Sequence, residues 1–171
     1  MADYSECRGN YDGLREEIDR FLRKLLLEND IKVISVTSRT KEMESLETKV
    51  SRADADYNNL VDVTDLCGLR VVTFFSEDVD IVADMIQSEF EIDSANFVDK
   101  GAQLDPDQFG YLSLHYVSKL KSPRSELPEY ARFSGLKFEI QIRSILQHAW
   151  AEIEHDWGYK SAVAIPKSVR R

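Results

Sequence analysis

The stretch LKFEIQIR, residues 136–143, alternates strictly between apolar and polar side chains. Successive side chains of a β-strand point to opposite faces of its sheet, so this alternation predicts a strand with one apolar and one polar face. The apolar side chains belong in a core, and the polar ones point away from it. The polar face carries Lys137, Glu139, Gln141 and Arg143.

A second predicted strand, over residues 111–120, has a similar pattern. Tyr111, Ser113 and His115 share one face, while leucines and a further tyrosine share the other. Two polar strand faces lying side by side would form the floor of an active site. A solvated sheet face is the alternative, because antiparallel sheets often leave one side in water.

The remaining pattern indicates helices interleaved with strands. Apolar residues at helical spacing predict helices over residues 11–26, 40–52, 76–90 and 144–157. Runs of β-branched and apolar residues predict further strands over residues 32–37 and 66–75. The first of these strands is expected to pass into its helix at residues 38–40. We therefore expect an α+β fold, a mixed sheet with flanking helices, in which residues 1–29 form an N-terminal helix packed on the sheet.

The composition limits the class of protein. The chain has 171 residues, 43% of them hydrophobic and 31% charged, which suits one globular domain over residues 1–171. Its formal net charge of −9 argues against the broad positive field that accompanies non-specific binding to nucleic acid. An anionic ligand must therefore meet a local basic patch.

Cysteine usage and hydropathy indicate the compartment. Cys7 and Cys67 lack metal-binding spacing, and we find neither a secretory leader nor an apolar run of the roughly 20 residues that a spanning helix needs. We expect a cytoplasmic protein that does not enter a membrane. The last residues, 169–171, show no helix-terminating signal, which leaves open that the chain is truncated at its C-terminus.

Two carboxylates are candidate ligands for a hard cation. Asp65 opens the most apolar predicted strand, and Glu139 lies in the middle of the last one. Magnesium is bound in this way by one or two carboxylates, while substrate phosphates supply further oxygens. Asp62 is an equally good candidate, and an aspartate before a strand is also commonly a turn residue.

Basic residues gather after the first predicted strand. Arg39 precedes the predicted helix. One side of that helix then carries Lys41, Ser45, Lys49 and Arg52. Cations near a helix N-terminus would neutralise a triphosphate, and the serine would donate a further hydrogen bond. The alternative is a solvated face whose cations pair with neighbouring glutamates.

Two further features concern side chains that would contact a ligand. His148, Glu152 and His155 share one face of the last predicted helix. Their spacing differs from the HExxH zinc pattern, so hydrogen bonding to the backbone or to substrate is favoured over a zinc site. Tyr111 follows Gly110 in a loop and is placed to stack on a purine, with an ordinary half-buried strand tyrosine as the alternative.

Five blocks of sequence follow one another in a fixed order. They are SRTK (38–41) with Ser45 and Lys49, DLCGLR (65–70), GYLSLH (110–115), EIQIR (139–143), and HAWAEIEH (148–155) with Tyr159 and Lys160. Together they resemble the synthetase domain of the RelA/SpoT family of alarmone synthetases, over residues 30–161. The chain looks like the small single-domain branch, since no hydrolase domain precedes the blocks. The resemblance implies a nucleotidyltransferase-like α+β fold with a mixed five-stranded sheet.

The same resemblance implies an activity and roles for residues. The activity is transfer of the β,γ-pyrophosphate of ATP to the 3′-hydroxyl of GDP or GTP, with Mg²⁺ as cofactor. Asp65 and Glu139 would hold the ion, and Glu139 would also lie near the attacking hydroxyl, where it could act as its base. The ATP phosphates would meet Arg39, Lys41, Ser45, Lys49 and Arg70. The acceptor nucleotide would meet Tyr111, His115, Gln141 and Arg143. We expect support for this site from His148, Glu152 and His155.

Several alternatives stay open on the acceptor side. Phe109 stands where many family members have Asn, and Leu112 stands where many have Arg or Gln. Some relatives of this domain are toxins that modify the 3′-end of tRNA, so tRNA remains a possible acceptor. A catalytically silent nucleotide-binding module is the third reading, against which Asp65, Glu139 and the basic residues speak. The sequence also leaves open a homo-oligomer.

Overall fold

A computed structural model describes residues 2–53, 57–94, 98–99 and 113–160 of the chain. The helices are α1 (Ala2–Glu28), α2 (Met43–Val50), α3 (Ser76–Glu89) and α4 (Ile145–Lys160). The strands are β1 (Val33–Thr40), β2 (Cys67–Thr73), β3 (Phe90–Ile92), β4 (Val98–Asp99), β5 (Leu114–Leu120) and β6 (Phe138–Ser144). Short 3-10 helices lie at Leu60–Asp62, Arg124–Glu126 and Ala131–Phe133.

The strands form one mixed sheet. Its order is β1-β2-β6-β5-β3, and the two-residue β4 pairs with β5 beside this five-stranded path. β2 and β6 run parallel, whereas the other pairs run antiparallel. The α+β fold with a mixed five-stranded sheet is therefore confirmed. The short strands β3 and β4 were not expected from the sequence, because two or three residues are too few to show an alternation.

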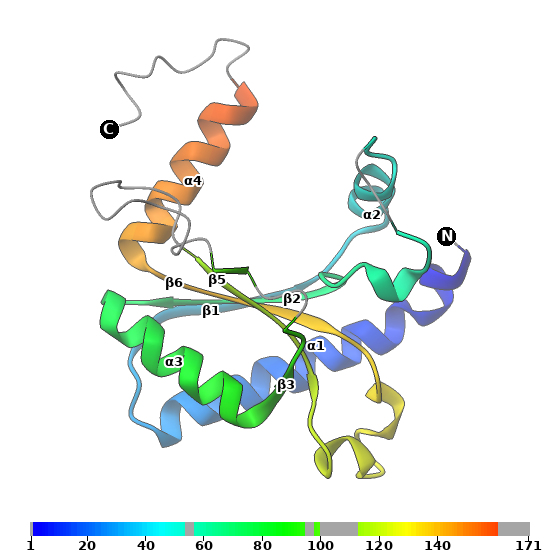
Figure 1. The fold of residues 1–171 in the computed structure, drawn as a ribbon, viewed down its shortest axis with the longest axis horizontal. Coiled ribbons are helices and arrows are strands. Elements are labelled where there is room, and N and C mark those ends of the chain that lie inside the picture. Colours follow the sequence, from blue (N-terminus) through cyan, green and yellow to red (C-terminus); the bar gives the residue numbers. More distant parts are fainter. Residues whose placement is uncertain (1, 54–56, 95–97, 100–112, 161–171) are drawn as a thin grey trace.

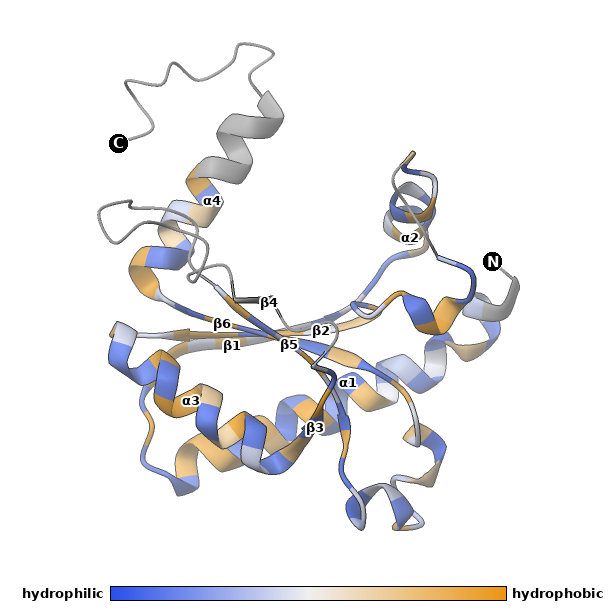
Figure 2. Ribbon diagram, in the orientation of Figure 1, coloured by the Kyte–Doolittle hydropathy of each residue, from blue (hydrophilic) through white to orange (hydrophobic). Residues whose placement is uncertain are grey.

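The two faces of the sheet differ in what covers them. Figure 1 shows α1 and α3 on one side and α2 and α4 on the other, at opposite ends. α1 packs on β1 and β2, and α3 packs on β6. The core between them is apolar and includes Leu14, Ile18, Leu22, Ile86 and Ile140. Apolar and hydrophilic positions alternate along α1 and α3 in Figure 2, as expected for amphipathic helices that cover a sheet.

β1 is longer than predicted, which corrects one local expectation. Ser38, Arg39 and Thr40 pair with β2 at Leu69, Gly68 and Cys67, so the sheet ladder keeps them extended. The strand-to-helix transition therefore comes after Thr40, and α2 begins only at Met43. Arg39 is accordingly a strand residue and does not directly precede the helix.

The start of α4 agrees with the sequence pattern. The Ser144 backbone amide donates to Gln147 Oε1 over 2.7 Å, and the Gln147 amide donates to Ser144 Oγ over 3.4 Å. This reciprocal capping box ends β6 and fixes the direction in which α4 leaves the sheet. Within the described ranges, no helix combines the length and the apolar character needed to cross a membrane.

Candidate active site

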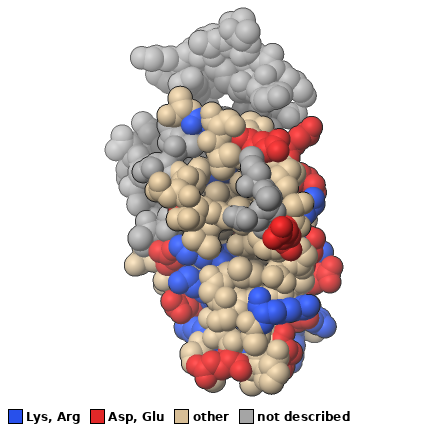
Figure 3. All heavy atoms as spheres, turned by 90° about the vertical axis from the view of Figure 1, so that its right-hand side faces the viewer, with Lys and Arg blue, Asp and Glu red and all other residues tan. Residues whose placement is uncertain are grey.

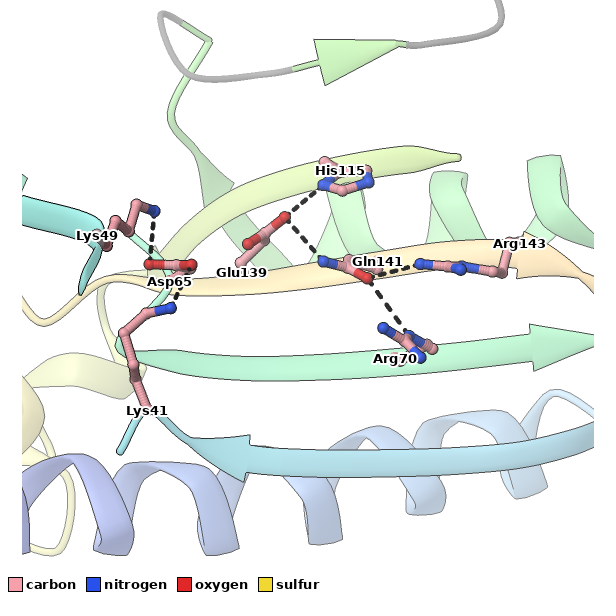
Figure 4. A network of polar contacts seen from close by, with 8 residues as sticks. All are labelled: Lys41, Lys49, Asp65, Arg70, His115, Glu139, Gln141 and Arg143. Atoms are coloured by element: carbon pink, nitrogen blue, oxygen red, sulfur yellow. Dashed lines mark hydrogen bonds and ion pairs between the residues drawn. The ribbon is translucent and has the colours of Figure 1, made fainter. Parts of the chain in front are cut away.

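The register of the central strands gathers polar side chains on the face away from α1 and α3. Gly68 of β2 lies opposite Glu139 of β6, and Arg70 lies opposite Gln141. On the other side of β6, His115 of β5 also lies opposite Gln141. The two polar strand faces predicted from sequence thus lie side by side, and Figure 4 shows their side chains pointing toward one another.

Asp65, just before β2, is held by two lysines. Lys41 Nζ lies 2.9 Å from Asp65 Oδ2, and Lys49 Nζ lies 2.9 Å from Oδ1. Burial by itself would raise the pKa of Asp65, but the hydrogen bonds from Lys49 and Lys41 outweigh it and lower that pKa below the ordinary 3.8. The carboxylate is therefore ionised at neutral pH.

The basic stripe predicted along one helix is only partly formed. Lys41 lies before α2 and Lys49 in its last turn, and both converge on Asp65 from opposite sides. Ser45 is exposed on α2, and Arg39 is exposed on β1. The alternative was that the cations of this stripe pair with neighbouring glutamates. Among the described ion pairs, Lys41 and Lys49 instead both pair with Asp65.

Glu139 lies beside Asp65 on the polar face. It is 15% exposed in its side chain and pairs with His115 Nδ1 through Oε1, while Gln141 Nε2 donates to the same oxygen over 3.3 Å. Burial and repulsion from Asp65 act to raise the pKa of Glu139. The hydrogen bonds and charge of His115, with the hydrogen bond from Gln141, outweigh them, so the net shift of this pKa is downward. Two ionised carboxylates, one just before β2 and one on β6, thus share one part of the sheet.

Gln141 connects Glu139 to two arginines. Its Oε1 accepts hydrogen bonds from Arg143 Nη2 over 2.9 Å and from Arg70 Nε over 3.4 Å. Arg143 is only 1% exposed, so its guanidinium is a buried positive charge at the end of this network on β6. With its carbonyl committed to the arginines, the Gln141 amide must donate toward Glu139, and this fixes the orientation of both side chains.

The helix α4 adds side chains at the far end of this network. Glu152 Oε1 lies 3.3 Å from Arg70 Nη1 and 3.6 Å from His148 Nδ1. Burial and the neighbouring Arg143 lower the pKa of His148, which keeps its imidazole neutral at pH 7. Among the described residues no group of three or more His, Cys, Asp or Glu could hold a metal ion. The third member of the predicted face, His155, falls outside the described side chains.

The structure also bears on other candidates. Asp62 accepts hydrogen bonds from the backbone amides of Asn58 and Asn59 over 2.9 and 2.7 Å, so it caps a 3-10 turn and is a weaker candidate for a cation ligand than Asp65. Tyr111 lies outside the described residues.

Two tyrosines beside the lysines were not expected from sequence. The Tyr57 ring centroid lies 5.6 Å from Lys49 Nζ, and the Tyr4 hydroxyl contacts the Lys41 backbone.

Nothing in the sequence indicates the contacts that these two tyrosines make with the lysines. Tyr57 follows a polar segment without periodicity, and Tyr4 lies 37 positions from the residue it contacts. An extension of the helical apolar spacing from residue 11 back to residue 4 would have shown that Tyr4 is buried.

Comparison with known proteins shows a family for most of the chain. Residues 38–164 match the family described as "Region found in RelA / SpoT proteins". A curated relative, GTP pyrophosphokinase YjbM of Bacillus subtilis (strain 168), is 30% identical over 141 residues, which cover 79% of this chain and 61% of the relative. The chain thus spans 61% of the length of the curated relatives it matches first.

Solved structures show the same fold. The crystal structure of small alarmone synthetase 1 from Bacillus subtilis has a TM-score of 0.76 at 26% identity and covers 99% of this chain and 86% of that one. The structure of that synthetase bound to its product pppGpp has a TM-score of 0.73 at 26% identity, over 99% of this chain and 87% of that one.

Proposed function

The chain belongs to the RelA/SpoT family, and we propose that it transfers the β,γ-pyrophosphate of ATP to the 3′-hydroxyl of GDP or GTP. The observation that carries the proposal is the pair of ionised carboxylates, Asp65 and Glu139, side by side on a polar sheet face. Lys41 and Lys49 contact Asp65, and Arg70 and Arg143 contact Gln141, which itself donates to Glu139. Two relatives, a GTP pyrophosphokinase and a small alarmone synthetase bound to its product pppGpp, support the choice of substrates.

The donor half of the site is built around Asp65. Lys41 and Lys49 hold their ammonium groups at this carboxylate, and Arg70 presents a half-buried guanidinium farther along β2. A triphosphate entering here would exchange part of the lysine–aspartate pairing for lysine–phosphate contacts. Arg39 and Ser45 are exposed and free to turn toward the same phosphates.

The carboxylates suit a divalent cation. Hard oxygen ligands that stay ionised are what Mg²⁺ requires, and two protein carboxylates with substrate phosphate oxygens are a common set. Asp65 and Glu139 would hold the ion, which when bound would offset negative charge on the transferred phosphates. Since both oxygens of Asp65 now contact ammonium groups, one lysine would have to yield its oxygen to the ion.

The acceptor half lies along β5 and β6. Glu139 would take the proton from the 3′-hydroxyl as the bond from that oxygen to the β-phosphorus forms and the bond from the α-phosphate oxygen breaks, releasing AMP. His115 and Gln141 hold the Glu139 carboxylate in place. The acceptor would contact Tyr111, His115, Gln141 and Arg143, with His148, Glu152 and His155 of α4 close by.

Positioning would supply most of the rate enhancement. Phosphoryl transfer asks little covalent work of a protein, so alignment of the attacking oxygen with the leaving AMP and compensation of charge dominate. The fixed network from His115 to Arg143 gives this face few ways to rearrange, which favours such alignment.

A nucleotide acceptor is favoured over tRNA. The net charge is −9, and basic and acidic side chains are interspersed on the face that Figure 3 shows. A tRNA would be held mainly through its phosphates, which needs a more extended basic surface.

A cytoplasmic setting, in which both nucleotides are present, is part of the proposal, as is the absence of a membrane partner.

The test follows the transferred group. Purified protein is incubated with γ-labelled ATP, Mg²⁺ and, separately, GDP, GTP or total tRNA, and the labelled products are separated. We expect label in a guanosine tetra- or pentaphosphate together with release of AMP. Label in tRNA would assign the acceptor differently, and label in none of the three, at protein concentrations that bind ATP, would refute a transferase and favour a silent nucleotide-binding module.

A further inference from the structure

One buried contact joins the first turn of α1 to the donor half of the site. Tyr4 is 0% exposed, and its hydroxyl donates a hydrogen bond to the Lys41 carbonyl oxygen over 2.5 Å. The Tyr4 ring packs against Tyr11, at 6.2 Å between ring centroids, so the side chain is fixed within the core. The hydroxyl therefore reaches the Lys41 backbone from a rigid base.

Lys41 is held at two further points. Its backbone amide donates to the Leu66 carbonyl over 2.8 Å, and its Nζ lies 2.9 Å from Asp65 Oδ2. Both of these contacts go to the segment that carries Asp65. The Tyr4 hydrogen bond holds the opposite side of the same residue, so that Lys41 spans from α1 to the candidate cation ligand.

A second contact from α1 supports the same turn. Arg8 Nη2 lies 2.7 and 2.8 Å from the two carboxylate oxygens of Glu42, the residue after Lys41. Arg8 is one helical turn beyond Tyr4, so both side chains leave α1 toward the β1–α2 turn. This second pair is exposed and contributes less than the buried hydrogen bond.

We propose that Tyr4 is a positioning residue for the donor nucleotide: together with Arg8 it holds the β1–α2 turn so that the Lys41 ammonium stays at Asp65. The inference rests on the proposed function, which assigns Lys41 to the ATP phosphates. Loss of the hydroxyl would free one side of the turn and let Lys41 sample positions away from Asp65. The acceptor half, on β5 and β6, makes no contact with this turn among the described residues and should be unaffected.

The main test compares Tyr4→Phe with Tyr11→Phe. Both changes remove one hydroxyl from a buried tyrosine of α1, but only Tyr4 donates to the Lys41 turn among the described contacts. Loss of one buried hydrogen bond should raise the KM for ATP about five- to tenfold in Tyr4→Phe, with the KM for GDP unchanged. Tyr11→Phe should leave both constants near those of the wild type. Equal effects of the two variants, or equal changes in both KM values, would overturn the proposal.

A second measurement does not depend on turnover. The Lys41 backbone amide donates to the Leu66 carbonyl, so release of the turn in Tyr4→Phe should speed hydrogen exchange of this amide in the nucleotide-free protein. Tyr11→Phe should leave it unchanged. An unaltered exchange rate of the Lys41 amide in Tyr4→Phe would show that the turn keeps its place without the hydroxyl.

A third set of variants avoids the core altogether. Arg8→Glu should raise the KM for ATP about twofold, as expected for an exposed pair, and the swap Arg8→Glu with Glu42→Arg should restore it. Failure of the swap to restore ATP binding would contradict a role of this pair in positioning the turn.

The failure of this inference can be told apart from the failure of the proposed function. If the wild type transfers no pyrophosphate, the proposed function fails. If the wild type does transfer it and Tyr4→Phe behaves like Tyr11→Phe, only this inference fails.

Discussion

Replacement of Glu139 by glutamine is the sharpest test of the proposed chemistry. The change keeps the size of the side chain and its place between His115 and Gln141, but it removes the ionised oxygen that the site maintains by lowering the pKa of Glu139. Loss of a general base alone costs about 10²–10⁴-fold in rate. Loss of one of two cation ligands adds to this, so kcat should fall by at least about 10²-fold.

Binding of ATP should survive the same change. Lys41 and Lys49 contact Asp65 and not Glu139, so the dissociation constant of a non-hydrolysable ATP analogue should change by no more than about twofold, the scatter expected for independent sites. Steady-state rates with labelled ATP give kcat, and calorimetry gives the analogue's affinity. Glu91→Gln is a matched control, since it makes the same chemical change at an exposed carboxylate on β3. A Glu139→Gln enzyme that keeps kcat within about tenfold of the wild type would refute the role of this residue as base.

Three further predictions concern the two halves of the site. Tyr111→Ala should raise the KM for the acceptor about five- to a hundredfold if the ring stacks on guanine, and initial rates at varied GDP measure this; an unchanged KM would remove Tyr111 from the acceptor site. Lys49→Met should raise the pKa of Asp65 and raise the KM for ATP about ten- to a hundredfold, and an unshifted carboxylate NMR titration would contradict the pairing. Because the folded-state pKa of Asp65 is lowered, its ion pairs stabilise the fold in full above the ordinary value of 3.8 and are lost as pH falls through the folded pKa. The stability advantage of the wild type over Asp65→Asn in urea unfolding should therefore stay constant from about pH 7 to about pH 5 and shrink as the pH falls below the ordinary value of 3.8. A pH-independent difference would show that Asp65 does not titrate as described.

Local patterns predicted much of the fold. The alternation in residues 136–143 gave β6 and its polar face, and helical spacing gave the bodies of α1, α3 and α4, because these patterns record which side of each element meets the core. The end of β1 could not be placed in the same way. Ser38, Arg39 and Thr40 stay extended because β2 pairs with them, and that pairing joins residues about 30 positions apart.

The sequence indicated candidate residues for the site but not the contacts between them. The order of the sequence blocks indicated Asp65, Glu139 and their basic neighbours as candidates, and the structure places them on one face of the sheet. The convergence of Lys41 and Lys49 on one carboxylate depends on where α2 starts, and the contact from Tyr4 depends on how α1 lies across the sheet. Interactions of this kind are decided by tertiary packing, which a single sequence does not display.

The position of β6 in the sheet has a consequence for folding. β6 is the last described strand along the chain, yet it lies between β2 and β5 and supplies Glu139, Gln141 and Arg143. Contacts between distant segments require closure of long loops, which makes them late and slow to form. A growing chain cannot join its two carboxylates until β6 has been synthesised and inserted, so no nascent fragment that ends before residue 138 can assemble this site.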